Sequence, residues 1–107
     1  MTISEIQKEV HRLAIEKGWY ESSRTVPELL CLVHSEISEA LEEYRNGHNL
    51  TYLGEGGKPE GLPIELADAV IRICDMAEGL GIDLENAIVA KHAYNRTRPH
   101  RHGGKLA

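Results

Sequence analysis

The chain has 107 residues, of which 41% are hydrophobic and only 5% aromatic, which is typical of one small domain over residues 1–107. A domain of this size has little room for a deep cavity, so we expect a site between helices or between subunits. Apolar runs extend over only a few residues, which predicts neither a membrane span nor a signal peptide. Cys31 and Cys74 lie 43 positions apart and indicate no disulfide framework, and we expect a reducing, cytoplasmic setting.

The formal net charge of −5 is distributed unevenly along the chain. Residues 1–90 hold all 17 acidic residues and seven of the Lys and Arg residues, whereas residues 91–107 hold five Lys and Arg residues and no acid. An acidic body therefore carries a basic tail, which we place at residues 96–107. Such a tail suits nucleic acid, an acidic surface or a phosphorylated small molecule, so the chemistry of the body has to decide among them.

Hydrophobic periodicity predicts an all-α fold of four helices and no strand of useful length. Ser4, Thr25 and Asp83 precede three of the periodic segments and are the expected N-caps. Residues 46–63 carry five glycines and two prolines, which predicts a long loop. A loop of this length is either a lid that contacts substrate or a plain surface connection. The predicted helices span residues 4–17, 25–45, 64–79 and 83–97.

Two pairs of acidic residues border the apolar faces of the second and third predicted helices. On a helical wheel Glu36 falls within the apolar arc of the second helix and Glu39 flanks it. The third helix is apolar over most of its circumference, and its narrow polar stripe includes Glu65 and Asp68. Because such a helix is normally buried, we expect the two helices to pack together and the four carboxylates to converge.

Four converging carboxylates need positive charge. At about 6 Å and an effective dielectric constant near 20, each pair repels by roughly 3 kcal/mol. The sequence contains no Glu-x-x-His, and the candidate ligands are all oxygens, which favours Mg²⁺ or Mn²⁺ over zinc or a di-iron centre. Magnesium is commonly held by a few carboxylates together with substrate phosphates, so a phosphorylated substrate is expected.

The acidic pairs also have a purely structural interpretation, in which they lie on solvated helix faces and bind no metal. Acidic pairs one turn apart are common on solvated helix faces. Arg72 is the cation nearest to them in sequence, and it is expected to pair with Asp68 or with Asp75 on its own helix.

The fourth predicted helix presents Lys91, Asn95 and Arg98 along one line. This row would supply hydrogen-bond donors for a metal-bound polyphosphate, or its cations would only stabilise the helix by interacting with the negative end of its dipole. Trp19 would stack on a nucleobase or pack in the core. Gly54 to Lys58 lacks the spacing of a phosphate-binding loop, so metals and side chains would have to hold any nucleotide.

Together these motifs resemble a known family. Glu36-x-x-Glu39, Glu65-x-x-Asp68 and Lys91-x-x-x-Asn95-x-x-Arg98 resemble the all-α nucleoside triphosphate pyrophosphohydrolases of the MazG-like superfamily. Lys58-Pro-Glu-Gly61, Glu65-Leu-Ala-Asp68 and the segment from Asn95 to Lys105 resemble its compact single-domain branch. The resemblance covers about residues 26–105.

The resemblance implies a four-helix MazG-like bundle that hydrolyses a nucleoside triphosphate to the monophosphate and pyrophosphate with Mg²⁺. It implies metal ligation by Glu36, Glu39, Glu65 and Asp68, with one of them orienting the attacking water, for which we choose Glu39. It also implies a homodimer or homotetramer whose site borrows residues from a neighbouring subunit. The residues that would hold the phosphates are Lys91, Asn95 and Arg98.

Two alternatives to an enzyme are carried forward. The first is a non-catalytic helical module whose basic tail, with His92 and residues 96–105, docks on nucleic acid or an acidic partner. The second is a regulatory protein that binds nucleotide without turnover. Because the body carries the paired acids, we rank the pyrophosphohydrolase first and give nucleic acid no role in it.

Overall fold

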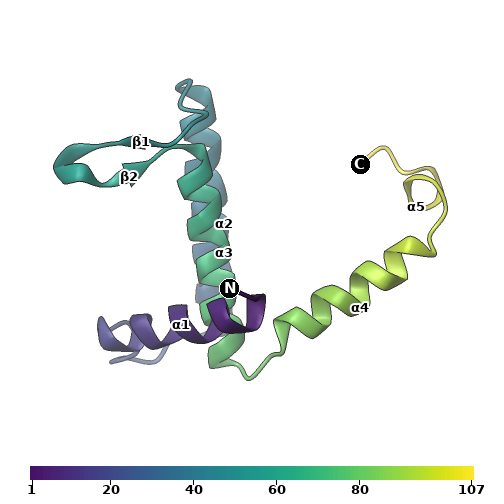
Figure 1. Ribbon diagram of the computed structural model, residues 1–107, viewed down its shortest axis with the longest axis horizontal. Helices are drawn as coiled ribbons and strands as arrows, with labels where there is room; N and C mark the ends of the chain where they lie inside the picture. The colour runs from purple at the N-terminus through teal and green to yellow at the C-terminus, as the bar shows by residue number, and fades with distance from the viewer.

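The computed structural model describes residues 1–107 and shows an all-α protein with one very small sheet (Figure 1). The four predicted helices are confirmed, and each observed end lies within two residues of its prediction. The sequence did not predict α5, a single turn in the basic tail. In chain order the elements are α1 (Ile3–Glu16), α2 (Val26–Arg45), β1 (Tyr52–Leu53), the 3₁₀ turn η1 (Glu55–Gly57), β2 (Pro59–Glu60), α3 (Leu62–Gly79), α4 (Leu84–Arg96) and α5 (Arg101–Gly104).

Local capping fixes the starts of three helices. Thr25 and Asp83 cap α2 and α4 as predicted, since each side chain accepts a hydrogen bond from the backbone N–H three residues later. The prediction of Ser4 as the cap of α1 is wrong. Thr2 caps this helix instead, in a capping box in which Thr2 and Glu5 each bond the other's backbone N–H.

Helix α3 begins two residues earlier than predicted, at Leu62, with Pro63 in its first turn. Gly61 precedes it with a φ of +113°, a conformation that favours glycine. The carbonyl of Gly61 accepts hydrogen bonds from the N–H groups of Ile64 and Glu65. A glycine-specific bend therefore sets the starting point of the helix that carries two of the candidate metal ligands.

The predicted loop between α2 and α3 contains a hairpin of two strands of two residues each, which the sequence did not predict. β1 and β2 pair antiparallel with Tyr52 opposite Glu60, and the ribbon projects from the end of the α2–α3 pair (Figure 1). The glycines close its turn, because Gly56 and Gly57 both have positive φ. The breakers that exclude a helix here thus permit a tight hairpin.

Helix α3 lies at the centre of the packed part of the molecule, where α2 runs alongside it and α1 crosses its C-terminal half (Figure 1). The buried apolar residues are small: Ala40 on α2, and Ala69, Cys74 and Ala77 on α3. Small side chains let helix backbones approach closely. The core is thin, and the prediction that α3 is buried nearly all round is not met within one chain, because Leu66 and Val70 are about half exposed.

Helix α4 extends away from the other helices, and no residue on it is buried (Figure 1). Around its start, Gln7 donates to the carbonyl of Ile82 at 2.7 Å, and the N–H of Ser4 donates to Glu85 at 3.3 Å. The radius of gyration is 16.4 Å, compared with about 13 Å for a compact chain of this length. Within a single chain, therefore, α4 does not close a bundle with α1, α2 and α3. None of the helices combines the length and apolar character needed to cross a lipid bilayer.

Candidate metal centre

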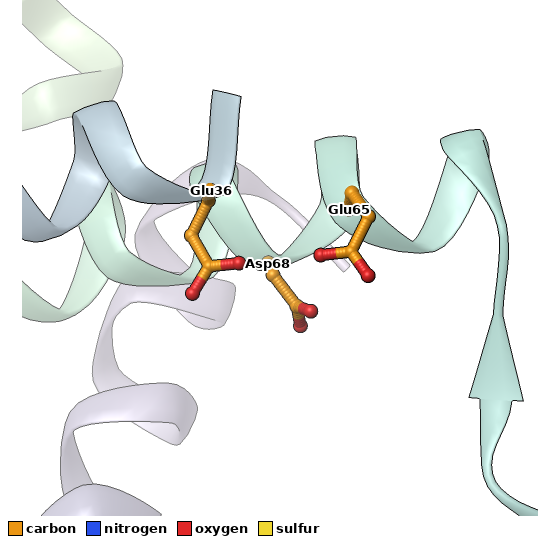
Figure 2. A group of neighbouring side chains, drawn as sticks. All are labelled: Glu36, Glu65 and Asp68. Carbon is orange, nitrogen blue, oxygen red and sulfur yellow. The ribbon is translucent and has the colours of Figure 1, made fainter. Parts of the chain in front are cut away.

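Three acidic side chains converge between α2 and α3. Glu36 comes from α2, and Glu65 and Asp68 come from successive turns of α3 (Figure 2). Each offers one carboxylate oxygen, and these three oxygens all lie within 4.8 Å of one another. Of the four predicted ligands, three therefore form a compact group.

The packing of α2 on α3 directs these acids inward. Ala40 lies one turn after Glu36 and is buried, and Ala69 follows Asp68 directly and is also buried. Glu36 itself is only 7% exposed. The position of Glu36 within the apolar arc, which the helical wheel predicted, places its carboxylate at the helix interface rather than in solvent.

Glu39, the fourth predicted ligand, lies at the edge of the site. Its residue is exposed, and it is not a member of the group of three. Its carboxylate nevertheless interacts with Glu65: burial, followed by hydrogen bonding with Glu39 and the charges of the surrounding acids, raises the pKa of Glu65 to about 7. Burial, followed by the charge of Glu36, also raises the pKa of Asp68 above its usual value.

Arg72 forms an ion pair that differs from the one predicted. Its Nε donates to Oε1 of Glu36 at 2.7 Å, across the α2–α3 interface, whereas pairing with Asp68 or Asp75 on its own helix was expected. Arg72 pairs with Glu36 rather than with Asp68 or Asp75 because Glu36 is nearly buried, and an unpaired buried carboxylate is more costly than a partly exposed one. One cationic side chain of the protein is thus already bound at the cluster.

The residues fit a hard divalent cation. The donor set consists of carboxylate oxygens alone, which suits Mg²⁺ or Mn²⁺. Oε2 of Glu65 is buried and has no hydrogen-bond partner, which leaves an acceptor without a donor. Burial, followed by the charges of the neighbouring acids, raises the pKa values of both Glu65 and Asp68 above their usual values.

A cavity of about 390 Å³ adjoins the carboxylates and lies between α1, α2, α3 and the link that follows α1. Glu36 and Asp68 line it together with Trp19. Trp19 is 58% exposed, and the guanidinium of Arg24 lies over its ring, 5.1 Å from the centroid. Trp19 is therefore not a core residue, and it lines the same cavity as Glu36 and Asp68 with the Arg24 guanidinium over its ring. Volumes in this range are typical of small-molecule sites.

The predicted phosphate-binding row on α4 lies away from this cluster in the same chain (Figure 1). Within the row, the Lys91 Nζ atom and the Arg98 guanidinium carbon lie 4.9 Å and 5.9 Å from the ring centroid of Tyr94. Oδ1 of Asn95 is buried without a partner. Lys91 and Asn95 share α4 as predicted, whereas Arg98 lies two residues beyond its end, and one chain does not bring the three side chains to the carboxylates.

Sequence reasoning assigned no role in a site to three charged residues that line the cavity: Lys17, Arg24 and Asp75. The only signal for Asp75 is its position on the polar stripe of α3, seven residues after Asp68. Comparisons of the chain with protein-family models, with curated proteins and with solved structures find no match. The chemistry of the site therefore has to follow from its own residues.

Proposed function

We propose that this protein is a Mg²⁺-dependent hydrolase that converts a nucleoside triphosphate to the monophosphate and pyrophosphate. The observation that carries the proposal is the convergence of Glu36, Glu65 and Asp68 beside a cavity that Trp19 also lines. Carboxylates that hold a hard dication suit a phosphate chain, and a partly exposed indole suits a nucleobase. The MazG-like resemblance of the motifs supports the same activity.

In this proposal Glu36, Glu65 and Asp68 hold the metal, with Mn²⁺ as the replacement for Mg²⁺. When bound, the metal neutralises phosphate charge and lowers the pKa of an attacking water. The anhydride bond between the α- and β-phosphorus centres breaks, water supplies the new oxygen and pyrophosphate leaves. Glu39, which is exposed at the edge of the cluster and next to Glu65, accepts the proton of the water.

The departing pyrophosphate needs positive charge at the carboxylates, and Lys17 and Arg24 line the adjoining cavity but are not among the cations that act on Asp68. Arg72 is bound to Glu36, and Lys58 is the other cation close enough to act on Asp68. We assign further phosphate contacts to a second copy, with charge from Lys91 and Arg98 and a hydrogen-bond donor from Asn95, because α4 extends away from its own body. Of these, Lys91 would stabilise charge in the reaction itself.

The surface area of the chain supports self-association as a homodimer or homotetramer. The accessible surface is 8076 Å², whereas a compact monomer of this mass exposes about 5,900 Å². The difference of about 2,000 Å² exceeds the roughly 800 Å² that each partner buries in a standard interface. Large apolar side chains remain exposed on several helices, among them Leu41, Leu66 and Val89.

The experiment that tests the proposal is a panel of ribo- and deoxyribonucleoside triphosphates assayed for pyrophosphate release, with Mg²⁺ or with a chelator. We expect metal-dependent release from the wild-type protein. Glu36→Gln should lower kcat/KM at least about 100-fold, because it removes a metal ligand. Glu42→Gln, the same change at an exposed position on the same helix, should leave it unchanged.

Two results would contradict the proposal. One is the absence of hydrolysis across the panel, and binding of triphosphate without turnover would then identify a regulatory nucleotide-binding protein. The other is release that Glu36→Gln and the chelator leave intact. Binding of nucleic acid through the basic tail, with a steep salt dependence and no hydrolysis, would favour a non-catalytic interaction module.

A further inference from the structure

The cavity adjoins only one side of the acidic cluster. It is lined by Asp68 and, further along α3, by Asp75, but not by Glu65. Glu65 lies one turn before Asp68, on the side of the cluster nearer to β2 (Figure 2). A nucleotide whose base lies in the cavity with Trp19 therefore directs its phosphate chain from Asp68 past Glu65, towards the β1–β2 hairpin.

Contacts at the base of the hairpin hold it against α2. The hydroxyl of Tyr52 on β1 donates to Oε2 of Glu43 on α2 at 3.4 Å, and Nδ1 of His48 lies 2.9 Å from the same oxygen. Burial, followed by hydrogen bonding with Glu60 and the charge of Glu43, raises the pKa of Tyr52 to about 12, so the hydroxyl keeps its proton at neutral pH. The N–H of Leu62 donates to the carbonyl of His48 at 3.0 Å. The hairpin is therefore tied both to α2 and to the start of α3.

Lys58 is the only Lys or Arg residue of this hairpin. It directly precedes β2 in an extended conformation, so the alternation of side chains places it on the same face as Glu60 and the opposite residue Tyr52. Its Nζ atom lies 4.0 Å from Oε1 of Glu60, and its side chain is 76% exposed. The Glu60 carboxylate in turn lies against Gly54, where an added Cβ would collide with it. Lys58 thus has one long ionic contact, on the face of the hairpin that meets α2.

The charge of Lys58 reaches the acidic cluster. Burial and the charge of Glu36 raise the pKa of Asp68, whereas the charges of Arg72 and Lys58 lower it. Arg72 is bound to Glu36 at 2.7 Å. Of these two cations, Lys58 is therefore the one whose donors remain available to a phosphate group.

We propose that Lys58 is a catalytic residue that binds the terminal phosphates of the triphosphate and stabilises the pyrophosphate as it leaves. This inference rests on the proposed function. When the bond between the α-phosphorus and the bridging oxygen breaks, its electron pair stays with the pyrophosphate, and the ammonium group offsets the added negative charge. Lys58 belongs to the same chain as the carboxylates, so this contact needs no second copy.

The test compares the α,β-methylene analogues of ATP, CTP, GTP and UTP, which resist cleavage at that bond, with the corresponding monophosphates. Binding to the full chain with Mg²⁺ is measured by titration calorimetry. We expect at least one analogue to bind the wild type at least about tenfold more tightly than its monophosphate. Lys58→Gln should lower the affinity for this analogue about tenfold or more and change that for the monophosphate less than about twofold, because the monophosphate has no terminal phosphates.

Two further variants make the result specific. Lys58→Arg keeps the positive charge and should recover most of the affinity for the analogue. Lys8→Gln removes the same charge from an exposed position on α1 that does not line the cavity, and it should leave both affinities unchanged. Circular dichroism checks that each variant is folded.

Equal affinities of the wild type for every analogue and its monophosphate would overturn the proposal, as would absent binding. A Lys58→Gln variant that loses both affinities equally, or neither, would also overturn it. The pyrophosphate assay separates this proposal from the one above. A selective loss of analogue binding in a protein without hydrolysis would contradict the enzyme and leave the contact to the terminal phosphates standing, whereas hydrolysis that Lys58→Gln leaves intact would do the opposite.

Discussion

The guanidinium of Arg72 donates a hydrogen bond of 2.7 Å from Nε to Oε1 of Glu36, and this bond joins α3 to α2 at the candidate metal centre. Glu36 lies almost out of contact with water, so its charge depends on this partner when no other cation is bound. Arg72 therefore neutralises part of the negative charge of the carboxylates, which in our proposal the metal also neutralises.

Replacing Arg72 should destabilise the metal-free protein more than the metal-loaded protein. We expect Arg72→Met to lower the free energy of unfolding by about 1–3 kcal/mol without Mg²⁺, less than for a fully buried pair because the Arg72 side chain is 38% exposed. Saturating Mg²⁺ should recover much of this loss. Urea denaturation with and without Mg²⁺ measures the difference. Arg12→Met breaks an exposed pair on α1 and should change stability by less than about 0.5 kcal/mol in both conditions; equal losses in both conditions for Arg72→Met would contradict the idea.

The raised pKa of Glu65 predicts how stability depends on pH. In the folded, metal-free protein this pKa is about 7, against an ordinary value of 4.5, so the folded state binds the proton more tightly than the unfolded chain. The resulting stabilisation is complete below the lower value and is lost as pH rises through about 7. Mg²⁺ needs the ionised carboxylate, so the shift of Tm by Mg²⁺ should grow over the same range.

Thermal unfolding at about pH 5 and about pH 8, with and without Mg²⁺, tests this dependence. Glu65→Gln is the matched control, because it cannot ionise, and it should abolish most of the pH-dependent difference in the effect of Mg²⁺. A Tm shift by Mg²⁺ that is the same at both pH values in the wild type would show that proton release from Glu65 is not linked to metal binding.

Glu39→Gln should separate catalysis from metal binding. Glu39 lies outside the group of three ligand oxygens, so the affinity for Mg²⁺ should fall less than about tenfold. Loss of a proton acceptor should lower kcat about 100-fold or more. Calorimetry with Mg²⁺ and the pyrophosphate assay give the two values. An equal loss of affinity in Glu39→Gln and Glu36→Gln would instead identify Glu39 as a full ligand.

Gly61→Ala should move the start of α3 and with it the site. A Cβ atom at Gly61 would collide with the backbone carbonyl of Leu50, and the φ of +113° disfavours any other residue. Gly56 also has positive φ, but an added Cβ meets open space, so Gly56→Ala is the matched control. We expect Gly61→Ala to lose at least about 2 kcal/mol more than this control, which carries only the backbone penalty of about 1–2 kcal/mol. It should also weaken Mg²⁺ binding, and equal stability of the two variants would contradict the role of the bend.

Val89→Asp tests the association surface. Val89 is 61% exposed on α4, and burying a charge there in an interface would be strongly unfavourable. We expect size-exclusion chromatography with light scattering to show an oligomer for the wild type and a smaller species for the variant, with reduced hydrolysis. Asn86→Asp adds the same charge near the start of the same helix and should leave assembly unchanged. A monomeric wild type would remove the assignment of Lys91, Asn95 and Arg98 to a neighbouring site.

Much of the local structure follows from the sequence, because its causes are local. Thr25, Asp83 and the hydrophobic periodicity are enough to place the helices to within two residues. The helical wheel also identifies Glu36 as an acid on a buried face. The cap at Thr2 and the hairpin after α2 were not predicted from the sequence. For such short elements, alternative capping residues and alternative loop conformations differ only slightly in free energy.

Only the tertiary structure decides which of these residues meet. Arg72 pairs across the helix interface and not along its own helix, because desolvation of Glu36 outweighs the small benefit of a surface pair. Spacing along one helix likewise cannot place Asp75 beside Tyr20 and His11, which come from other segments. The sequence determined that α4 is a helix with a cationic row, but its extension away from the body depends on packing between segments distant in the chain.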